Sequence, residues 1–312
     1  MNSVFFGTSS FALPTLEILA QRFGLRAVFT RPDAIARRGQ TPDASPVKTR
    51  AHSLGIPVYT PHSLCTRSQE NAKPLNDTLG QRIPDAHVVA HIQQYKPDVI
   101  VVASYGLILP PALLGLAQAG CVNVHASLLP RWRGAAPIQR AILAGDREVG
   151  VSIMRVEAGL DSGPYCGQAA VAAQDKTYEQ LVDALGKLGA RLLSKTLPAI
   201  VEGSIAWTAQ DTNLATYAHK LRKGSIDLDD SLTQIENINR VRASSTHIRC
   251  RAVLFGQPVV ILAARLAQPT ESRQLLWQCA DGPIAILELK PDGRQAMSGQ
   301  AFLAGYGNRE HR

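Results

Sequence analysis

The sequence has little of what marks several classes of protein. Its 312 residues include only five cysteines, none in a Cys-x-x-Cys pair, so neither a disulfide framework nor a cysteine zinc site is expected. The first residues hold no basic stretch followed by a long apolar one, which argues against a signal peptide. With 45% hydrophobic and 19% charged residues, the composition excludes collagen and a disordered tail protein. We therefore expect a cytoplasmic globular protein with reduced thiols.

An uninterrupted hydrophobic run long enough for a membrane helix is also lacking. The stretch from Val99 to Val124 carries no charge and has the length to span a bilayer. However, Gly106, Gly120 and the adjacent Pro110 and Pro111 interrupt it, and two neighbouring prolines cannot both lie inside a helix. The stretch instead predicts a strand, a turn, a short helix, a turn and a second strand, all in a core, and no contact with a membrane.

Negative charge is the scarcer sign. Lys and Arg number 33 against 25 Asp and Glu, which gives a net charge of +8. A basic protein can bind a polyanion such as nucleic acid, although net charge alone does not identify the partner.

Apolar segments alternate with helical patterns over the first two thirds of the chain. Buried strands are predicted at residues 3–6, 25–29, 98–103 and 121–125, and a long helix at 178–201. Continuously apolar strands that alternate with helices are typical of a parallel sheet covered on both faces. We therefore predict a Rossmann-like, mostly parallel α/β domain over residues 1–204.

The pattern changes after Gly203. Short strands at 253–255, 259–263, 275–279 and 284–289 are separated by turns that contain Gly or Pro. This spacing favours a small, OB-like β-barrel. We predict a linker over residues 205–213 and the barrel domain over 214–312.

Parallel sheets bind ligands beyond the carboxyl ends of their strands. The turn after the first strand has Ser9 where the Gly-x-Gly-x-x-Gly fingerprint needs its second glycine, so a dinucleotide site is not expected. Asn123 and His125 lie two residues apart on a predicted strand, so their side chains share one face. An amide beside an imidazole can stabilise an oxyanion and move a proton, but a histidine in an apolar strand is more often a core residue.

A longer motif follows these two residues. Ser127-Leu128-Leu129-Pro130 and the run Arg133-Gly134-Ala135-Ala136-Pro137-Ile138-Gln139 resemble the signature of the methionyl-tRNA formyltransferase family. Further segments similar to that family lie at residues 5–8, 11–14, 31–33, 45–48, 150–154, 159–163, 291–293 and 302–303. The resemblance thus extends over almost the whole chain.

The resemblance implies a reaction and the residues that perform it. Members of this family transfer a formyl group from 10-formyltetrahydrofolate to the α-amine of methionine on initiator tRNA. Their catalytic asparagine, histidine and aspartate fall here on Asn123, His125 and Asp161. The residues expected to line the folate pocket are Ser127, Leu128, Leu129, Pro130, Tyr105 and Gly106. Without the family, Asp161 would be taken as a turn residue.

The resemblance also implies where the tRNA binds. Arg37 and Arg38 are in a long loop, and basic side chains there would meet phosphates of the acceptor stem. The chain departs from its relatives at Gln40 and Thr41, where lysines are frequent, and at residues 244–250, which lack the usual Pro-aromatic-Pro-Gly turn. A weaker electrostatic hold on tRNA is therefore expected.

Three other functions stay open at this stage. One is a formyltransferase that acts on an amino-sugar nucleotide or a purine precursor, and another is a hydrolase that releases formate from the same folate. The third, a non-enzymatic RNA-binding protein, gives no purpose to Asn123 and His125. No cluster of His, Cys and carboxylate residues has metal-ligand spacing, so no metal is expected. We expect a monomer.

Overall fold

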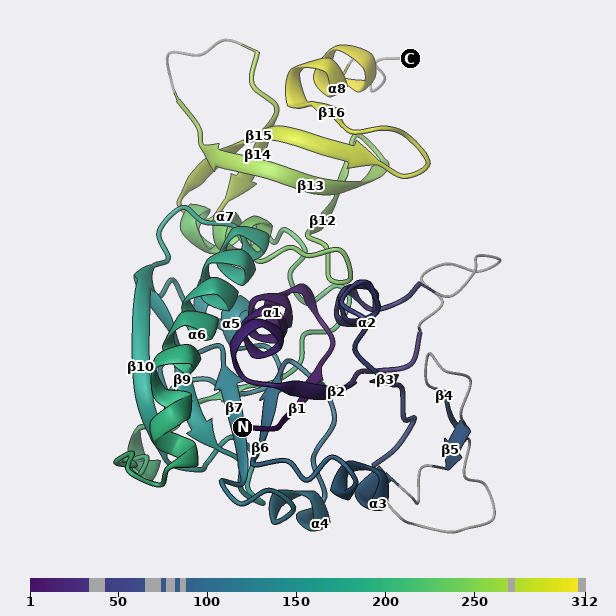
Figure 1. Cartoon of the computed structure of the whole chain (residues 1–312). Coiled ribbons are helices and arrows are strands. Elements are labelled where there is room, and N and C mark those ends of the chain that lie inside the picture. The colour runs from purple at the N-terminus through teal and green to yellow at the C-terminus, as the bar shows by residue number, and fades with distance from the viewer. Residues whose placement is uncertain (34–42, 65–73, 77–81, 85–87, 269–272, 308–312) are drawn as a thin grey trace. The chain divides into compact units, whose positions relative to one another are not determined.

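The computed structural model describes residues 1–33, 43–64, 74–76, 82–84, 88–268 and 273–307 (Figure 1). Arg37 and Arg38 lie outside these residues. The chain forms two compact units that alternate along the sequence. The first contains residues 1–135, 150–171 and 182–217, and the second contains residues 136–149, 172–181 and 218–312.

The helices are α1 (Leu13–Arg22), α2 (Pro46–Ser53), α3 (Val88–Gln93), α4 (Pro111–Leu114), α5 (Pro137–Leu143), α6 (Tyr178–Val201), α7 (Gln234–Arg242) and α8 (Gly299–Tyr306). The first ten strands are β1 (Ser3–Gly7), β2 (Leu25–Phe29), β3 (Val58–Tyr59), β4 (Pro74–Asn76), β5 (Arg82–Pro84), β6 (Val99–Ala103), β7 (Cys121–His125), β8 (Arg133–Gly134), β9 (Glu148–Arg155) and β10 (Tyr165–Ala172). The last six are β11 (Tyr217–Ala218), β12 (Arg251–Leu254), β13 (Gln257–Leu266), β14 (Leu276–Cys279), β15 (Gly282–Pro291) and β16 (Met297–Ser298).

A seven-stranded sheet with the order β10-β9-β7-β6-β1-β2-β3 forms the centre of the first unit. The pairs β1–β2, β1–β6, β2–β3 and β6–β7 are parallel, whereas β7 and β9 pair antiparallel. This arrangement confirms the predicted mostly parallel sheet. It also places β7, which carries Asn123 and His125, between a parallel and an antiparallel neighbour.

The strands of this sheet are apolar because helices cover both of its faces. All five residues of β1 and all five of β6 are buried. Val4, Phe6 and Ile100 pack on one face with residues of α3 and α4, while α1 packs against β1 and β2. Since side chains alternate along a strand, Phe5 points to the opposite face from Val4 and Phe6. The uncharged stretch of residues 99–124 forms β6, α4 and β7, as predicted, and among the described helices none could cross a membrane.

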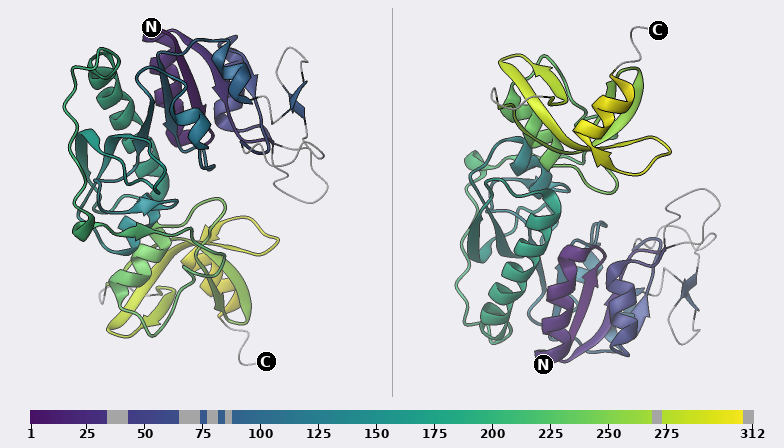
Figure 2. Two further views of the ribbon diagram at one scale, coloured as in Figure 1. Left: turned by 90° about the horizontal axis from the view of Figure 1, so that it is seen from below. Right: turned by 90° about the horizontal axis from the view of Figure 1, so that it is seen from above.

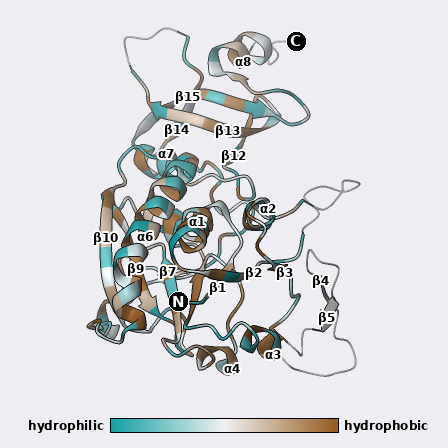
Figure 3. Cartoon of the chain, in the orientation of Figure 1, coloured by the Kyte–Doolittle hydropathy of each residue, from teal (hydrophilic) through white to brown (hydrophobic). Residues whose placement is uncertain are grey.

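The long helix α6 has the bounds predicted from its leucine spacing, and Figure 3 shows both hydrophobic and hydrophilic residues along it. Two of its glycines permit a close approach to the site. A Cβ atom at Gly186 would lie 2.8 Å from the Phe11 carbonyl oxygen, and one at Gly189 would lie 2.5 Å from the Val124 side chain. Both distances are too short for a larger residue, so these glycines let α6 pack directly against β7 and the turn after β1.

A curled antiparallel sheet, half of a barrel, forms the second unit's core (Figure 2). Its strand order is β12-β13-β15-β14, with β16 paired to β15. The register between β13 and β15 shifts between Ile261 and Ala264, and such bulges bend and twist a strand. Val259, Ile261, Leu289 and Phe302 are buried together in its core. The antiparallel β fold predicted for the C-terminal domain is thereby confirmed.

Several elements were missed in the sequence. β10 consists mainly of small and polar residues, and α7 is rich in Asn and Arg, so neither has a clear apolar period. A capping box between Thr233 and Glu236 starts α7 instead. Residues 244–250, which lack the Pro-aromatic-Pro-Gly turn of the relatives, form a turn closed by two serines. The Ile248 N–H donates to Ser245 Oγ at 3.1 Å, and the Cys250 N–H donates to Ser244 Oγ at 3.1 Å.

Candidate active site

His125 stands at the carboxyl end of β7 with its side chain only 6% exposed. Its Nε2 atom is 3.0 Å from the carbonyl oxygen of Trp132. A carbonyl oxygen can only accept a hydrogen bond, so Nε2 carries the proton in this arrangement. The other ring nitrogen, Nδ1, is therefore the atom that can gain or lose a proton.

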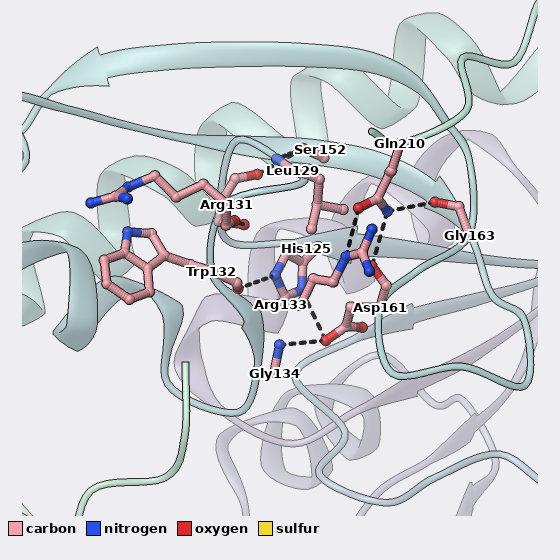
Figure 4. Close-up of polar contacts among 11 residues, drawn as sticks. His125, Leu129, Arg131, Trp132, Arg133, Gly134, Ser152, Asp161, Gly163 and Gln210 are labelled. Atoms are coloured by element: carbon pink, nitrogen blue, oxygen red, sulfur yellow. Dashed lines mark hydrogen bonds and ion pairs between the residues drawn. The ribbon is translucent and has the colours of Figure 1, made fainter. Parts of the chain in front are cut away.

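Asp161 faces that second nitrogen, although 36 positions separate the two residues in the sequence. Its Oδ2 atom lies 3.7 Å from His125 Nδ1 and accepts a hydrogen bond of 2.9 Å from the Gly134 N–H (Figure 4). Asp161 has a φ of +46°, in the left-handed region. The loop thus turns sharply at this residue and brings its carboxylate against β7. At this separation the carboxylate can stabilise a positive charge on the imidazole.

Asn123 is on the same face of β7, opposite Val102 of β6 and Met154 of β9 in the sheet register. Its side chain is partly exposed, and within the described part of the chain we find no hydrogen bond to its amide group. Its N–H groups are therefore available to a ligand. The three residues that the family resemblance assigns to catalysis contribute an amide donor, an imidazole and a carboxylate.

The loop after β7 is held by one internal hydrogen bond and by hydrogen bonds to β9 and β10. Ser127 Oγ donates to the Arg131 carbonyl at 2.6 Å, and the Leu129 N–H donates to Ser152 Oγ at 3.1 Å. Gln168 adds a hydrogen bond of 2.8 Å from its Nε2 to the Leu129 carbonyl. Ser127 and Leu129 are buried, whereas Leu128 and Pro130 are partly exposed. Of these four residues predicted to line the folate pocket, the buried pair thus holds the loop in place, and the other pair has partly exposed side chains.

Tyr105 and Gly106 follow β6. The Tyr105 ring is buried edge-on against Phe6, with ring centres 5.0 Å apart. Gly106 has a φ of +82°, a conformation that favours glycine. Thr8 Oγ1 donates to the Tyr105 carbonyl at 3.1 Å, which ties the turn after β1 to this loop. Nothing in the residue spacing predicts that link.

Two residues beside Asp161 were not predicted as site residues: Arg133 entered only as part of the signature motif, and Gln210 not at all. Arg133 is 4% exposed, and its Nε donates to Gln210 Oε1 at 2.9 Å. Gln210 in turn donates from Nε2 to the carbonyls of Asp161, at 2.9 Å, and Gly163, at 2.6 Å (Figure 4). Gln210 was missed because it lies in a polar stretch that resembled a plain linker.

The cysteine nearest to these residues in sequence is not a nucleophile. Cys121 begins β7 and is almost fully buried, and burial raises the pKa of its thiol to about 12. The thiolate that nucleophilic chemistry needs is therefore very scarce near neutral pH. Among the described residues, no group of three His, Cys, Asp or Glu side chains is placed to hold a metal ion.

Comparison with known families and structures gives consistent results. The sequence pattern of the formyl transferase family matches residues 1–197, and that of the formyl transferase C-terminal domain matches residues 220–307. The methionyl-tRNA formyltransferase of Methylococcus capsulatus is 39% identical over 315 residues, covering 97% of this chain and 96% of the relative. That of Pseudomonas entomophila is also 39% identical, covering 96% of this chain and 94% of the relative.

Solved structures share the fold at low sequence identity. HypX from Aquifex aeolicus, solved in complex with tetrahydrofolic acid, has a TM-score of 0.62 at 14% identity, covering 98% of this chain and 47% of that chain. The N-formyltransferase from Helicobacter canadensis, solved with folinic acid and dTDP-3-aminofucose, has a TM-score of 0.60 at 15% identity, covering 95% and 98%.

Proposed function

The chain belongs to the methionyl-tRNA formyltransferase family, and on that premise we propose that it formylates methionine on initiator tRNA. The formyl donor is 10-formyltetrahydrofolate, and the acceptor is the α-amine of the methionyl group. The observation that carries this proposal is the meeting of His125 and Asp161 beside Asn123 at the end of β7. The product, N-formylmethionyl-tRNA, serves translation initiation.

The reaction needs two things from the protein. The amine nitrogen attacks the formyl carbon, the carbon–N10 bond of the folate breaks, and one proton moves from the amine to the leaving nitrogen. The negative charge that develops on the formyl oxygen requires hydrogen-bond donors in a water-poor site. A group that can accept and return a proton must stand close by.

The three proposed catalytic residues match these needs. The unengaged amide of Asn123 can donate to the developing oxyanion. His125 already carries a proton on Nε2, which the Trp132 carbonyl holds, so a second proton on Nδ1 makes it an imidazolium. Asp161, 3.7 Å from that Nδ1, stabilises this cation and can take the proton that the amine releases.

We propose that the folate donor lies against the loop after β7 and the turn after β6. Leu128 and Pro130 offer partly exposed apolar surface, and Gly106 leaves its backbone accessible. Ser127, Leu129 and the backbone of Tyr105 would act by keeping these two loops in place. The hydrogen bonds that hold the loop after β7 support this assignment, because a loop fixed in advance loses less entropy when a ligand binds.

The proposed tRNA contacts come from two places. Arg37 and Arg38 would neutralise phosphates of the acceptor stem, and the curled sheet of residues 214–312 would form the second tRNA-binding domain. The catalytic domain would then be residues 1–204. Family matches that end at residue 197 and resume at residue 220 support this division. We also propose that the protein is a monomer that works in the cytoplasm.

A direct assay tests the proposal. The purified chain is incubated with 10-formyltetrahydrofolate and methionyl initiator tRNA, the ester is hydrolysed mildly, and the released amino acid is identified by mass spectrometry. N-formylmethionine is the expected product. Release of formate without formylmethionine would show a hydrolase instead.

A further inference from the structure

The segment of residues 208–216 follows α6 and lies along both loops of the active site. At its start, Thr208 forms two backbone hydrogen bonds with Tyr165, of 3.0 and 2.8 Å, just beyond the Asp161 turn. At its end, the Thr216 carbonyl accepts from the Arg133 N–H at 2.8 Å. A stretch that resembles a linker in sequence is thus joined by hydrogen bonds to the loops that carry Asp161 and Gly134.

Gln210 lies between these two attachments and uses its whole side-chain amide. Its Nε2 donates to the carbonyls of Asp161 and Gly163, at 2.9 and 2.6 Å. Its Oε1 accepts from Arg133 Nε at 2.9 Å. One neutral side chain therefore fixes the turn that carries the carboxylate and, at the same time, the residue next to Gly134.

These contacts connect the side chain of Asp161 to its own backbone carbonyl through Gly134, Arg133 and Gln210. The carboxylate is held by the Gly134 N–H, Arg133 precedes Gly134 in the chain, and Gln210 joins Arg133 to the Asp161 carbonyl. Arg133 is 4% exposed, and within the described part of the chain its guanidinium makes no hydrogen bond except the one to Gln210, leaving Nη2 unpaired. Gln210 thus contacts both the turn that carries Asp161 and the residue before Gly134, whose N–H holds the carboxylate.

We propose that Gln210 is a positioning residue for formyl transfer, which holds the Asp161 carboxylate beside His125. This inference rests on the proposed function. A displacement of about 1 Å at a reacting group can cost roughly 100-fold in rate. Gln210 touches no reacting atom, so its effect passes through Asp161.

The test uses Gln210→Met, which keeps the length of the side chain and removes all three hydrogen bonds. The full-length variant is expected to lose roughly 10- to 100-fold in kcat for methionyl-tRNA formylation, with KM for both substrates within about twofold of the wild type. Gln180→Met is the matched control: Gln180 also bonds a backbone group, the Thr177 N–H at 2.8 Å, and its replacement is expected to leave kcat unchanged. A Gln210→Met variant with wild-type kcat would overturn the inference.

Within the described residues Gln210 is the only hydrogen-bond partner of the buried Arg133 guanidinium, so its loss can also unfold the protein and a second variant is needed. Gln210→Glu keeps the acceptor for Arg133 and fills the same space, but a carboxylate cannot donate to the Asp161 and Gly163 carbonyls. It is expected to fold and to lose kcat to the same extent. Full activity of Gln210→Glu would equally overturn the inference.

A double-mutant cycle separates positioning from general damage. If Gln210 acts through Asp161, adding Gln210→Met to Asp161→Asn should lower kcat by no more than about threefold beyond Asp161→Asn alone. Losses that multiply would mean that Gln210 has a merely structural role and would contradict the inference. If the wild-type chain has no transferase activity, both the proposed function and this inference are overturned. If the wild type is active and the Gln210→Met variant is equally active, only this inference is overturned.

Discussion

Replacement of Asp161 by asparagine should remove one negative charge from the active site and leave its framework in place. The Gly134 N–H donates to Asp161 Oδ2 at 2.9 Å, and an asparagine oxygen can accept the same bond. Asparagine also tolerates the left-handed backbone of this residue, where φ is +46°. What disappears is the carboxylate 3.7 Å from His125 Nδ1, so the variant isolates its electrostatic contribution.

The size of the effect follows from that separation. Two unit charges 3.7 Å apart attract each other by about 4 kcal/mol at an effective dielectric constant of roughly 20. The His125 and Asp161 side chains are 6% and 19% exposed, so solvent screens the pair only in part. If this attraction acts mainly in the transition state, its loss lowers kcat by up to about 1000-fold, because each 1.36 kcal/mol is worth tenfold. The lower bound for losing a general acid–base partner is roughly 100-fold.

The assay is steady-state formylation of methionyl-tRNA with each substrate varied in turn. The fall in kcat should be accompanied by little change in either Michaelis constant, since Asp161 is proposed to act on the transition state. Asp183→Asn is the matched control, because it makes the same chemical change in an exposed surface pair with Lys187 and should leave kcat as it was. A kcat within threefold of the wild type for Asp161→Asn would refute the proposed role of the carboxylate.

Three further predictions concern other parts of the chain. Changing Arg37 and Arg38 to alanine should raise KM for methionyl-tRNA and leave KM for the formyl donor unchanged. A plot of the logarithm of the tRNA binding constant against the logarithm of salt concentration should become flatter by about 0.7 to 0.9 per lost phosphate contact. Binding that is unchanged at every salt concentration would remove the two arginines from the tRNA site. Thr233→Ala removes the cap of α7 and should lower the free energy of unfolding by about 1 kcal/mol, and an unshifted urea midpoint would contradict this. Burial raises the pKa of the Cys121 and Cys250 thiols to about 12, so the folded protein should resist iodoacetamide at both residues at pH 8. Labelling of either thiol in the folded protein would count against the burial. Because these pKa values lie above the ordinary thiol value of 9.0, the free energy of unfolding measured in urea should also fall as the pH rises from about 9.

The sequence predicted the parts of the fold that have a strong apolar pattern. The bounds of α6 follow from leucines at helical spacing, and β6 and β7 follow from unbroken apolar runs. β10 escaped prediction because Gly167, Gln168 and its alanines give no alternation. α7 escaped because Asn237 and Asn239 are weak helix formers, and its start depends on a capping box rather than on hydrophobic period.

The sequence patterns predicted only part of the active site. Asn123 and His125 share a strand face by spacing alone, but nothing in the spacing brings Asp161 to His125, since that contact depends on a left-handed turn and on the Gly134 N–H. Gln210 had no signal at all. Its role depends on three long-range hydrogen bonds, and a single polar residue in a polar stretch does not predict such bonds.

The most direct test of the proposed function is a competition for one labelled formyl group. The wild-type chain receives 10-formyltetrahydrofolate with an isotopically labelled formyl carbon, together with methionyl initiator tRNA, a dTDP-linked amino sugar and glycinamide ribonucleotide at equal concentrations. Mass spectrometry then follows the label in each acceptor and in free formate. We predict that nearly all of it appears as N-formylmethionine on the tRNA, and label that accumulates mainly in the amino sugar, in the ribonucleotide or in formate would contradict the proposed function.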